Sequence, residues 1–273
     1  SAMHGYIYGK WTWQYIWTLR NIRFPLAGER GKEKWANHYH AKTLTLDQAE
    51  SIIGLDHEIP LHDLEKIMPY QEVREFVLNG PVDVVLYECG CRRASGGKGG
   101  GCQPSQVCMV IGKPFTDLIV SLHPDISRRV TKEEALEVLR EEDERGHMHT
   151  AWFKDAMMDR FYAVCNCCKC CCVGLRGMKV NGLNMIAPSG YSAIRDEELC
   201  TTCGKCANVC PFDAVTVENK IVVFDHEKCM GCGVCVGLCP QHAMSLIRDE
   251  TKGVPLDVRE MLKPEPNVIV IQH

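Results

Sequence analysis

The apolar and polar positions of the chain predict short helices and strands in its first half. Thr45 and Gln48 have the spacing of a capping box, and Gly54 predicts where the helix that follows them ends. Thr131 and Glu134 form a second capping box. Apolar residues at helical spacing follow each pair, so we expect a helix after each.

Other segments have a clear periodicity without caps. Residues 61–68 and 71–78 carry apolar side chains at helical spacing, and residues 82–86 predict a buried strand that leads to Cys89. Aromatic side chains alternate over residues 11–17, which is typical of a strand packed on the core and also of a docking surface. The first half is therefore expected to mix small helices with strands.

The last third has a different pattern, in which short apolar runs lie between cysteines. Residues 214–217, 221–224 and 243–247 predict three short strands. Glycines and prolines over residues 174–190 predict a loop-rich junction ahead of these strands. We therefore expect a domain boundary near Ser189.

Composition adds limits on the class of protein. A chain of 273 residues that is 45% hydrophobic can bury a substantial core, and a formal net charge of -4 gives no reason to expect a nucleic-acid partner. The chain does not open with a basic segment followed by a long apolar stretch, so export is not indicated. Since no stretch approaches the ~18 apolar residues that span a bilayer, we expect a cytoplasmic protein without a transmembrane segment.

Cysteine is the most informative residue type, with 18 in the chain. Six of them fall within residues 165–172, too close together to bridge with one another easily. Without signs of export to an oxidising compartment, metal binding is favoured over disulfides. Thiolates crowded in this way suit soft metals.

Eight cysteines form an internal repeat near the C-terminus. The run Cys-x-x-Cys-x-x-Cys-x-x-x-Cys-Pro begins at Cys200 and again at Cys229, an offset of 29 residues. Two-residue intervals wrap a tight loop around three corners of a cube, and Gly204 and Gly233 permit the backbone angles that such a loop needs. A pair of zinc knuckles is the alternative, since Cys-x-x-Cys pairs also bind zinc.

This spacing resembles the bacterial two-cluster ferredoxin, in which three cysteines of one run and the fourth of the other hold each 4Fe-4S cluster. The resemblance implies two 4Fe-4S clusters in this chain. It assigns Cys200, Cys203, Cys206 and Cys239 to one cluster, and Cys229, Cys232, Cys235 and Cys210 to the other.

Together these patterns predict an α+β protein with three parts. Residues 1–188 are expected to form an N-terminal mixed α/β, cysteine-rich iron-sulfur domain, and residues 189–250 the ferredoxin-like two-cluster module. Residues 251–273 are expected to form a tail that packs back on the fold, in which the apolar residues 268–271 fit a strand.

Ten further cysteines lie upstream of the repeat. They can ligate two more 4Fe-4S clusters with two thiols left over, or one cluster of less usual form that draws ligands from two groups. Zinc competes, because nothing in Cys-x-Cys spacing excludes it. One group consists of Cys89, Cys91, Cys102 and Cys108, and the other of Cys165, Cys167, Cys168, Cys170, Cys171 and Cys172.

The order of these upstream features resembles that of a poorly characterised family of ferredoxin-fused iron-sulfur proteins from anaerobic bacteria and archaea. The features are Cys-x-Cys-Arg from Cys89, a capped helix, and the run Cys-Asn-Cys-Cys-Lys-Cys-Cys-Cys from Cys165. The resemblance covers residues 69–246. It implies one or two further iron-sulfur clusters in the N-terminal domain.

A few charged and polar residues are further candidates. Arg92 and Arg93 can offset the negative charge of a cluster or bind an anionic substrate. His147 and His149 can ligate metal or relay protons, although the polar end of a helix also accounts for them. The glycine-rich residues 96–101 fit a cluster loop better than a phosphate loop, because their lysine is not followed by Ser or Thr.

These observations favour redox chemistry over hydrolysis or hydride transfer, for which no catalytic triad, carboxylate pair or dinucleotide fingerprint stands out. We expect an electron-transfer protein that carries low-potential single electrons to or from a partner oxidoreductase or enzyme complex in anaerobic metabolism. The alternative is an oxidoreductase with a catalytic iron-sulfur cluster in the N-terminal domain, fed by the ferredoxin module. A substrate-sized pocket beside the run from Cys165 would favour the alternative.

Overall fold

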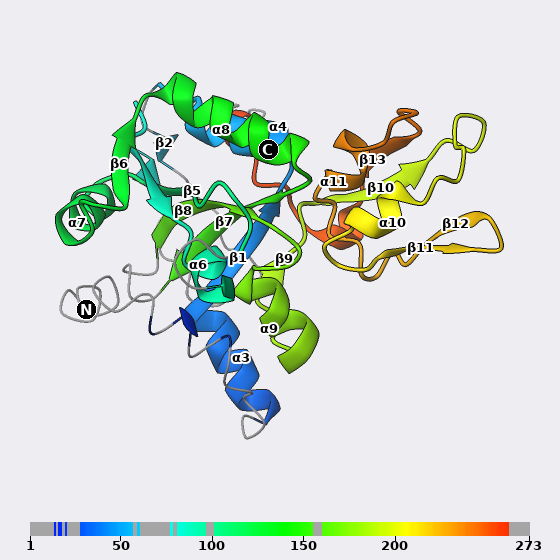
Figure 1. Cartoon of the computed structure of the whole chain (residues 1–273), viewed down its shortest axis with the longest axis horizontal. Helices are drawn as coiled ribbons and strands as arrows, with labels where there is room; N and C mark the ends of the chain where they lie inside the picture. The colour runs from blue at the N-terminus through cyan, green and yellow to red at the C-terminus, as the bar shows by residue number, and fades with distance from the viewer. Residues whose placement is uncertain are drawn as a thin grey trace, which may run out of the picture.

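A seven-stranded, mainly antiparallel sheet forms the centre of the N-terminal part (Figure 1). The computed structural model describes residues 28–56, 59–60, 77–78, 81–96, 101–154 and 160–261, together with Gln14, Ile16, Trp17 and Arg20. Across the sheet the strands are β6 (Ser127–Val130), β4 (Val84–Glu88), β5 (Gln106–Ile111), β8 (Arg160–Cys167), β7 (Met148–Lys154), β1 (Tyr39–Leu44) and β9 (Ile186–Ala187). Only the β1 and β9 pair is parallel among the strands described here.

Two helices cover one face of this sheet. They are α4 (Leu46–Ile53) and α8 (Lys132–Glu144), which lie side by side (Figure 1). Ile52 and Leu139 from the helices pack with Phe153 of the sheet in an apolar cluster without solvent access. Leu256 and Val258, from the segment after the C-terminal module, belong to the same cluster, so this segment returns to the N-terminal sheet.

The opposite face of the sheet carries the cysteines. Alternate side chains of a strand point to opposite faces, so Met109 of β5 lies in the cluster under α4 and α8 while Cys108 and Val110 face the other way. This second face is approached by α3 (Glu29–His38), α6 (Gly90–Gly96) and α9 (Val173–Asn181), with α7 (Phe115–Leu122) packed at one end (Figure 1).

The C-terminal part consists of two small antiparallel sheets and two short helices. Strand β10 (Tyr191–Arg195) pairs with β13 (Met244–Arg248), and β11 (Val215–Glu218) pairs with β12 (Ile221–Phe224). The helices are α10 (Lys205–Val209) and α11 (Val234–Gly237). The three strands predicted over residues 214–217, 221–224 and 243–247 are confirmed as β11, β12 and β13.

One apolar core joins the two parts. It contains Trp152 and Leu175 of the N-terminal part together with Phe212 and Val234 of the C-terminal part. At the junction Ser189 is fully buried, its backbone N–H donates to the carbonyl of Met230, and its hydroxyl donates to the carbonyl of Gly231 at 2.7 Å. The chain therefore passes from one part to the other through a hydrogen-bonded, buried connection.

The capped helices are confirmed. The Thr45 hydroxyl accepts from the backbone N–H of Gln48 and the Gln48 side chain accepts from that of Thr45, so the capping box of α4 is complete, and Gly54 ends the helix. Thr131 caps α8 by accepting from the N–H of Glu134. The buried strand expected over residues 82–86 is also confirmed, as β4.

Two local predictions differ from the structure where it describes them. Gln14, Ile16 and Trp17, the described part of residues 11–17, are helical, so a strand is wrong for them. The helix expected over 71–78 is wrong at its end, where β3 (Val77–Leu78) pairs with β2 (Ile59–Pro60), whereas residues 61–76 lie outside the described part. The strand expected at 268–271 also lies outside it.

The junction expected to be loop-rich over residues 174–190 contains helix α9. The reason is packing: a Cβ at Gly174 would lie 2.8 Å from the Trp152 ring, so this glycine allows the helix to approach the indole closely. Gly182, with φ of +63°, ends the helix. The prediction of a loop from these glycines is therefore wrong at Gly174, which serves close helix packing.

Gly231 gives a test of how tightly the junction is packed. A Cβ there would overlap the carbonyl oxygen of Tyr191 and the hydroxyl of Ser189, in addition to the backbone cost of φ +62°. Gly204 has a similar φ of +75° but its nearest neighbour, a Val217 methyl, lies 3.7 Å away.

We therefore expect Gly204→Ala to lower the free energy of unfolding by about 1–2 kcal/mol, the cost of a left-handed residue. Gly231→Ala should lower it by about 1–3 kcal/mol more, because it also overpacks the junction. Thermal unfolding of the anaerobically prepared proteins measures both, and equal losses would contradict the packing described here.

Candidate metal centres

The two cysteine runs of the C-terminal part fold as a structural repeat. Gly204 and Gly233 both have left-handed φ angles, of +75° and +84°, ahead of α10 and α11. Asp213 and His242, also 29 residues apart, have φ of +53° and +50°. The repeat in the sequence is therefore a repeat in the backbone.

The first set of four cysteines encloses a small cavity. Cys200, Cys203, Cys206 and Cys239 all line it. The backbone N–H of Ala243 donates to the sulfur of Cys239 at 3.3 Å. Amide donors of this kind stabilise the negative charge of a thiolate-bound cluster.

The second set, Cys210, Cys229, Cys232 and Cys235, is buried. Burial, together with the charges of Cys229 and Cys210, raises the pKa of Cys235 to about 12. The N–H groups of Ala214 and Ala193 donate to the sulfurs of Cys210 and Cys229, at 3.3 and 3.5 Å. Four thiols crowded in an apolar setting ionise together only when a cation compensates their charge, so this donor set fits a 4Fe-4S cluster.

The ten upstream cysteines separate into a set of four and a set of six. In the four-thiol set, the sulfurs of Cys102, Cys168, Cys170 and Cys171 all lie within 4.8 Å of one another. Although burial opposes it, hydrogen bonds from the Cys102 backbone and Ser95 lower the pKa of Cys171 to about 7. Cys170 is exposed, so this four-thiol set lies near the surface.

The six-thiol set forms a closed ring of contacts. Cys89 contacts Cys91 and Cys108, Cys165 contacts Cys108 and Cys167, and Cys172 contacts Cys91 and Cys167. Each of the six thiols therefore touches two others.

The sheet register explains half of this ring. Met109 of β5 lies opposite Val164 of β8, which places Cys108 opposite Cys165. Cys165 and Cys167 are two residues apart on β8 and share its face. Cys89, Cys91 and Cys172 approach from the loops and helix starts above this face.

The unusual cysteine run from Cys165 serves both sets. Cys165, Cys167 and Cys172 belong to the six-thiol set, whereas Cys168, Cys170 and Cys171 belong to the four-thiol set. Neighbouring residues thus divide between the sets at 167–168 and at 171–172. Since neighbouring Cα atoms are about 3.8 Å apart, the two sets are close neighbours in space. The sequence groups Cys102 with Cys89, Cys91 and Cys108. In the structure Cys102 lies instead with the four-thiol set.

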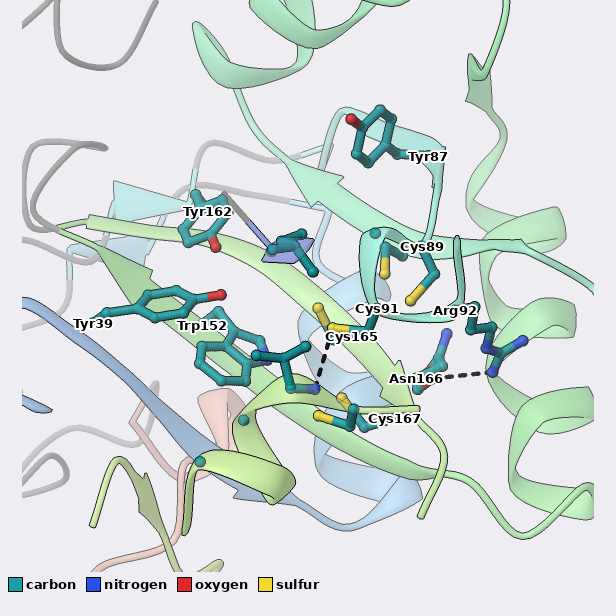
Figure 2. A pocket seen from close by; sticks show the side chains of 18 of the residues that line it. Tyr39, Tyr87, Cys89, Cys91, Arg92, Trp152, Tyr162, Cys165, Asn166 and Cys167 are labelled. Atoms are coloured by element: carbon teal, nitrogen blue, oxygen red, sulfur yellow. Dashed lines mark hydrogen bonds between the residues drawn. The ribbon is translucent and has the colours of Figure 1, made fainter. Parts of the chain in front are cut away.

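A cavity of about 120 Å³ opens beside the six-thiol set. A water molecule needs roughly 10–15 Å³ of such volume, so the cavity exceeds a water site about tenfold. Figure 2 shows sulfurs of Cys89, Cys91, Cys165 and Cys167 grouped together, with aromatic rings on another side of the space. These rings belong to Tyr39, Trp152 and Tyr162.

The described lining of this cavity has little charge. Among the described residues that line the cavity, Arg92 is the only Asp, Glu, Lys or Arg. Asn166 and Asn181 supply amides, while Val110, Phe115, Leu118 and Leu183 are among the apolar members. The chamber therefore suits an inorganic core on its sulfur side and an uncharged molecule elsewhere.

Arg92 is held by a buried polar network. It is fully buried and pairs with Glu142, and it also contacts Nδ1 of His147 at 3.0 Å and the carbonyl of Asn166 at 3.2 Å. Burial opposes the charge of Glu142, but hydrogen bonds from His147 and Arg92 outweigh it and lower the pKa of this carboxyl. The charge of Arg92 is thus balanced within the protein.

The polar helix end expected for the two histidines is confirmed for His147, whose backbone N–H donates to the carbonyl of Glu142 at the C-terminus of α8, and is wrong for His149. His149 lies in β7 without solvent access, and its Nδ1 is 2.7 Å from Oδ1 of Asn166. His147 is nearly buried against Glu142 at 2.7 Å. Arg93, the other basic candidate, pairs with Glu88 at 2.7 Å. The sequence of β7, Met-His-Thr-Ala-Trp-Phe-Lys, has no alternation of apolar and polar residues, so its pattern does not place His149 in a strand.

The comparison with protein families agrees with this geometry. Residues 192–240 match the family model described as a 4Fe-4S dicluster domain. The C-terminal part is therefore a ferredoxin-like iron-sulfur domain, a class of protein that carries electrons. No curated protein matches this chain. Among the described residues, no helix combines the length and hydropathy needed to cross a membrane.

The buried ion pair gives the second prediction. Glu142→Gln leaves the buried Arg92 without its charge partner, which should lower the free energy of unfolding by about 3–5 kcal/mol. Glu141→Gln is the matched control, because Glu141 is about half exposed and pairs with Arg145 at the surface. For this control, denaturant unfolding at pH 7 should show a free energy of unfolding lowered by less than about 1 kcal/mol. Similar losses for the two variants would contradict a structural role for the buried pair.

Proposed function

We propose that this protein carries single electrons between a partner oxidoreductase and thiolate-bound iron-sulfur centres on its N-terminal sheet. The two cysteine sets of the C-terminal module hold two 4Fe-4S clusters, and the upstream sets hold further clusters. Such clusters, when bound, take up and release single electrons. The protein's own residues fix where the clusters lie, exclude water between them and expose Cys203 of one C-terminal set to a partner.

The observation that carries this proposal is the shared apolar core. Cys210 and Cys229 of the C-terminal module pack in the same cluster of buried residues as Cys167 and Cys172 of the six-thiol set. No layer of water has to be crossed within such a core. The division expected near Ser189 then separates two redox parts that share one core.

One cysteine set of the module is placed for exchange with a partner. Cys203 is exposed, unlike the buried Cys229 set. Exposed Val217, Ile221 and Val223 lie on the neighbouring β11 and β12 hairpin. A small apolar surface beside an exposed redox centre fits the weak, transient interfaces of electron transfer.

The cellular setting is part of the proposal. All 18 cysteines are free thiols, and several are partly exposed. Exposed thiolates oxidise readily, and the cytoplasm keeps thiols reduced. We therefore place the protein in the cytoplasm of a cell with anaerobic metabolism.

Rapid-mixing EPR tests this route for electrons. A reduced two-cluster ferredoxin serves as the donor, and the signals of the upstream clusters are followed in the full chain. Cys203→Ala removes a thiol from the exposed set, so upstream reduction should slow at least tenfold. Ser121→Ala, exposed on α7 of the N-terminal part, should leave the rate unchanged. An unchanged rate in Cys203→Ala would show that electrons enter elsewhere.

The chamber beside the six-thiol set favours a second candidate function, an oxidoreductase. An electron carrier needs the sulfur side of this cavity for its cluster, whereas the side lined by aromatic rings fits an organic molecule. In this function an uncharged, largely apolar substrate binds in the chamber and accepts two electrons, delivered singly through the C-terminal module, and two protons from water. Tyr39, Trp152 and Tyr162 would hold the substrate against the sulfur side.

Binding of phenol, an uncharged aromatic probe, tests the chamber. Calorimetry on the iron-loaded chain should detect phenol and give at least tenfold weaker binding for the benzoate anion. Leu118→Trp fills the chamber and should weaken phenol binding tenfold or more, whereas Ser121→Trp, exposed on the same helix, should not. Equal phenol binding by both variants would remove the support for catalysis.

A further inference from the structure

The six-thiol set has more ligands than one cubic cluster can use. A 4Fe-4S cube offers four iron corners, each of which takes one thiolate. The set consists of Cys89, Cys91, Cys108, Cys165, Cys167 and Cys172, all of which line the same cavity. A separate four-thiol set already exists at Cys102, Cys168, Cys170 and Cys171, so the six are not shared with a second cube.

The contacts within the set do not separate four ligands from two spare thiols. Each thiol contacts two others in a closed ring, so all six occupy equivalent places. All six line the same cavity, as does the neighbouring Cys168 of the four-thiol set. The closed ring of contacts, which leaves Cys168 outside, is therefore what marks the six as one set.

The ring divides naturally into two groups of three. Cys108, Cys165 and Cys167 stand on the face of the sheet, while Cys89, Cys91 and Cys172 approach from above. The two groups meet at two contacts, one between Cys89 and Cys108 and the other between Cys167 and Cys172. Three thiolates on each side would hold one core larger than a cube between the sheet and the segments above it.

The negative charge of six thiolates also favours a core that contains many cations. Six thiolates carry six negative charges, whereas Arg92, the nearby cation, is balanced by Glu142. The backbone adds only partial charge: the N–H of Val173 donates to the sulfur of Cys91 at 3.4 Å, at the start of the nine-residue helix α9. Soft thiolates without oxygen or nitrogen ligands select iron-sulfur chemistry or zinc.

We propose that all six thiols bind a single iron-sulfur core of about eight iron atoms, larger than a cube, as a centre separate from the four-thiol cluster. Like the proposed function, this rests on iron being the upstream metal. The core occupies the sulfur side of the chamber. The rest of the chamber then lies against its surface, next to the aromatic rings.

The proposed core lies next to the four-thiol cluster, from which it can receive electrons. Cys167 and Cys172 of the six-thiol set are each the direct neighbour of a four-thiol ligand, Cys168 and Cys171. The four-thiol cluster lies nearer the surface, since Cys170 is exposed. It therefore stands beside the larger core as a one-electron neighbour.

Iron and sulfide counts with Mössbauer spectra of the anaerobically purified full chain test the proposal without any variant. We expect about twenty iron atoms per chain, eight from the C-terminal module, four from the four-thiol set and about eight from the six-thiol set. A count near sixteen, or zinc in the six-thiol set, overturns the larger core but leaves the proposed function. A count near eight overturns both.

Six single Cys→Ala variants then identify the ligands. Each variant of the six-thiol set should alter the same Mössbauer component and lose up to about eight iron atoms, if all six are ligands of one core. Cys170→Ala should lose about four iron atoms and leave that component unchanged. Should any two of the six variants keep the component intact, the core has only four protein ligands and the proposal is wrong.

Discussion

The mutual repulsion of crowded thiolates is the constraint on which this structure depends. Eighteen free thiols gather in four sets, and half of them are buried. Burial without a cation raises the pKa of such groups, as at Cys232 and Cys235. Ionised thiolates in these positions therefore require bound metal. Under the proposed function, folding and metal loading are coupled, because the metal that neutralises the sulfurs would also tie distant segments together.

The N-terminal sheet makes the upstream sets possible. Its antiparallel register brings Cys108 of β5 opposite Cys165 of β8, although 57 residues separate them in the chain. On the other face, α4 and α8 bury an ordinary apolar core that owes nothing to metal. The sheet thus has one face stabilised by hydrophobic burial and one that presents sulfur. The core shared with the C-terminal module contains or contacts cysteines of the six-thiol set and of both C-terminal sets.

Local sequence signals predicted what local physics determines. The capping box at Thr45 and the repeat from Cys200 to Cys239 depend on spacings of a few residues, and both are confirmed in the backbone. The division of the ten upstream thiols into sets of six and four could not be predicted from the sequence, because it depends on the pairing of β5 with β8. The loop predicted at Gly174 is wrong for the same reason, since the close approach of this residue to Trp152 is a tertiary contact.

The central claim is that inorganic cores hold the cysteine-bearing face of this protein together. Stepwise removal of iron by a chelator under anaerobic conditions, followed by hydrogen exchange, tests it most directly. The account predicts that protection is lost around residues 165–172 and 200–239 as iron leaves, while the α4 and α8 face keeps more of its protection. A colourless, iron-free chain with unchanged protection at the cysteines would contradict it.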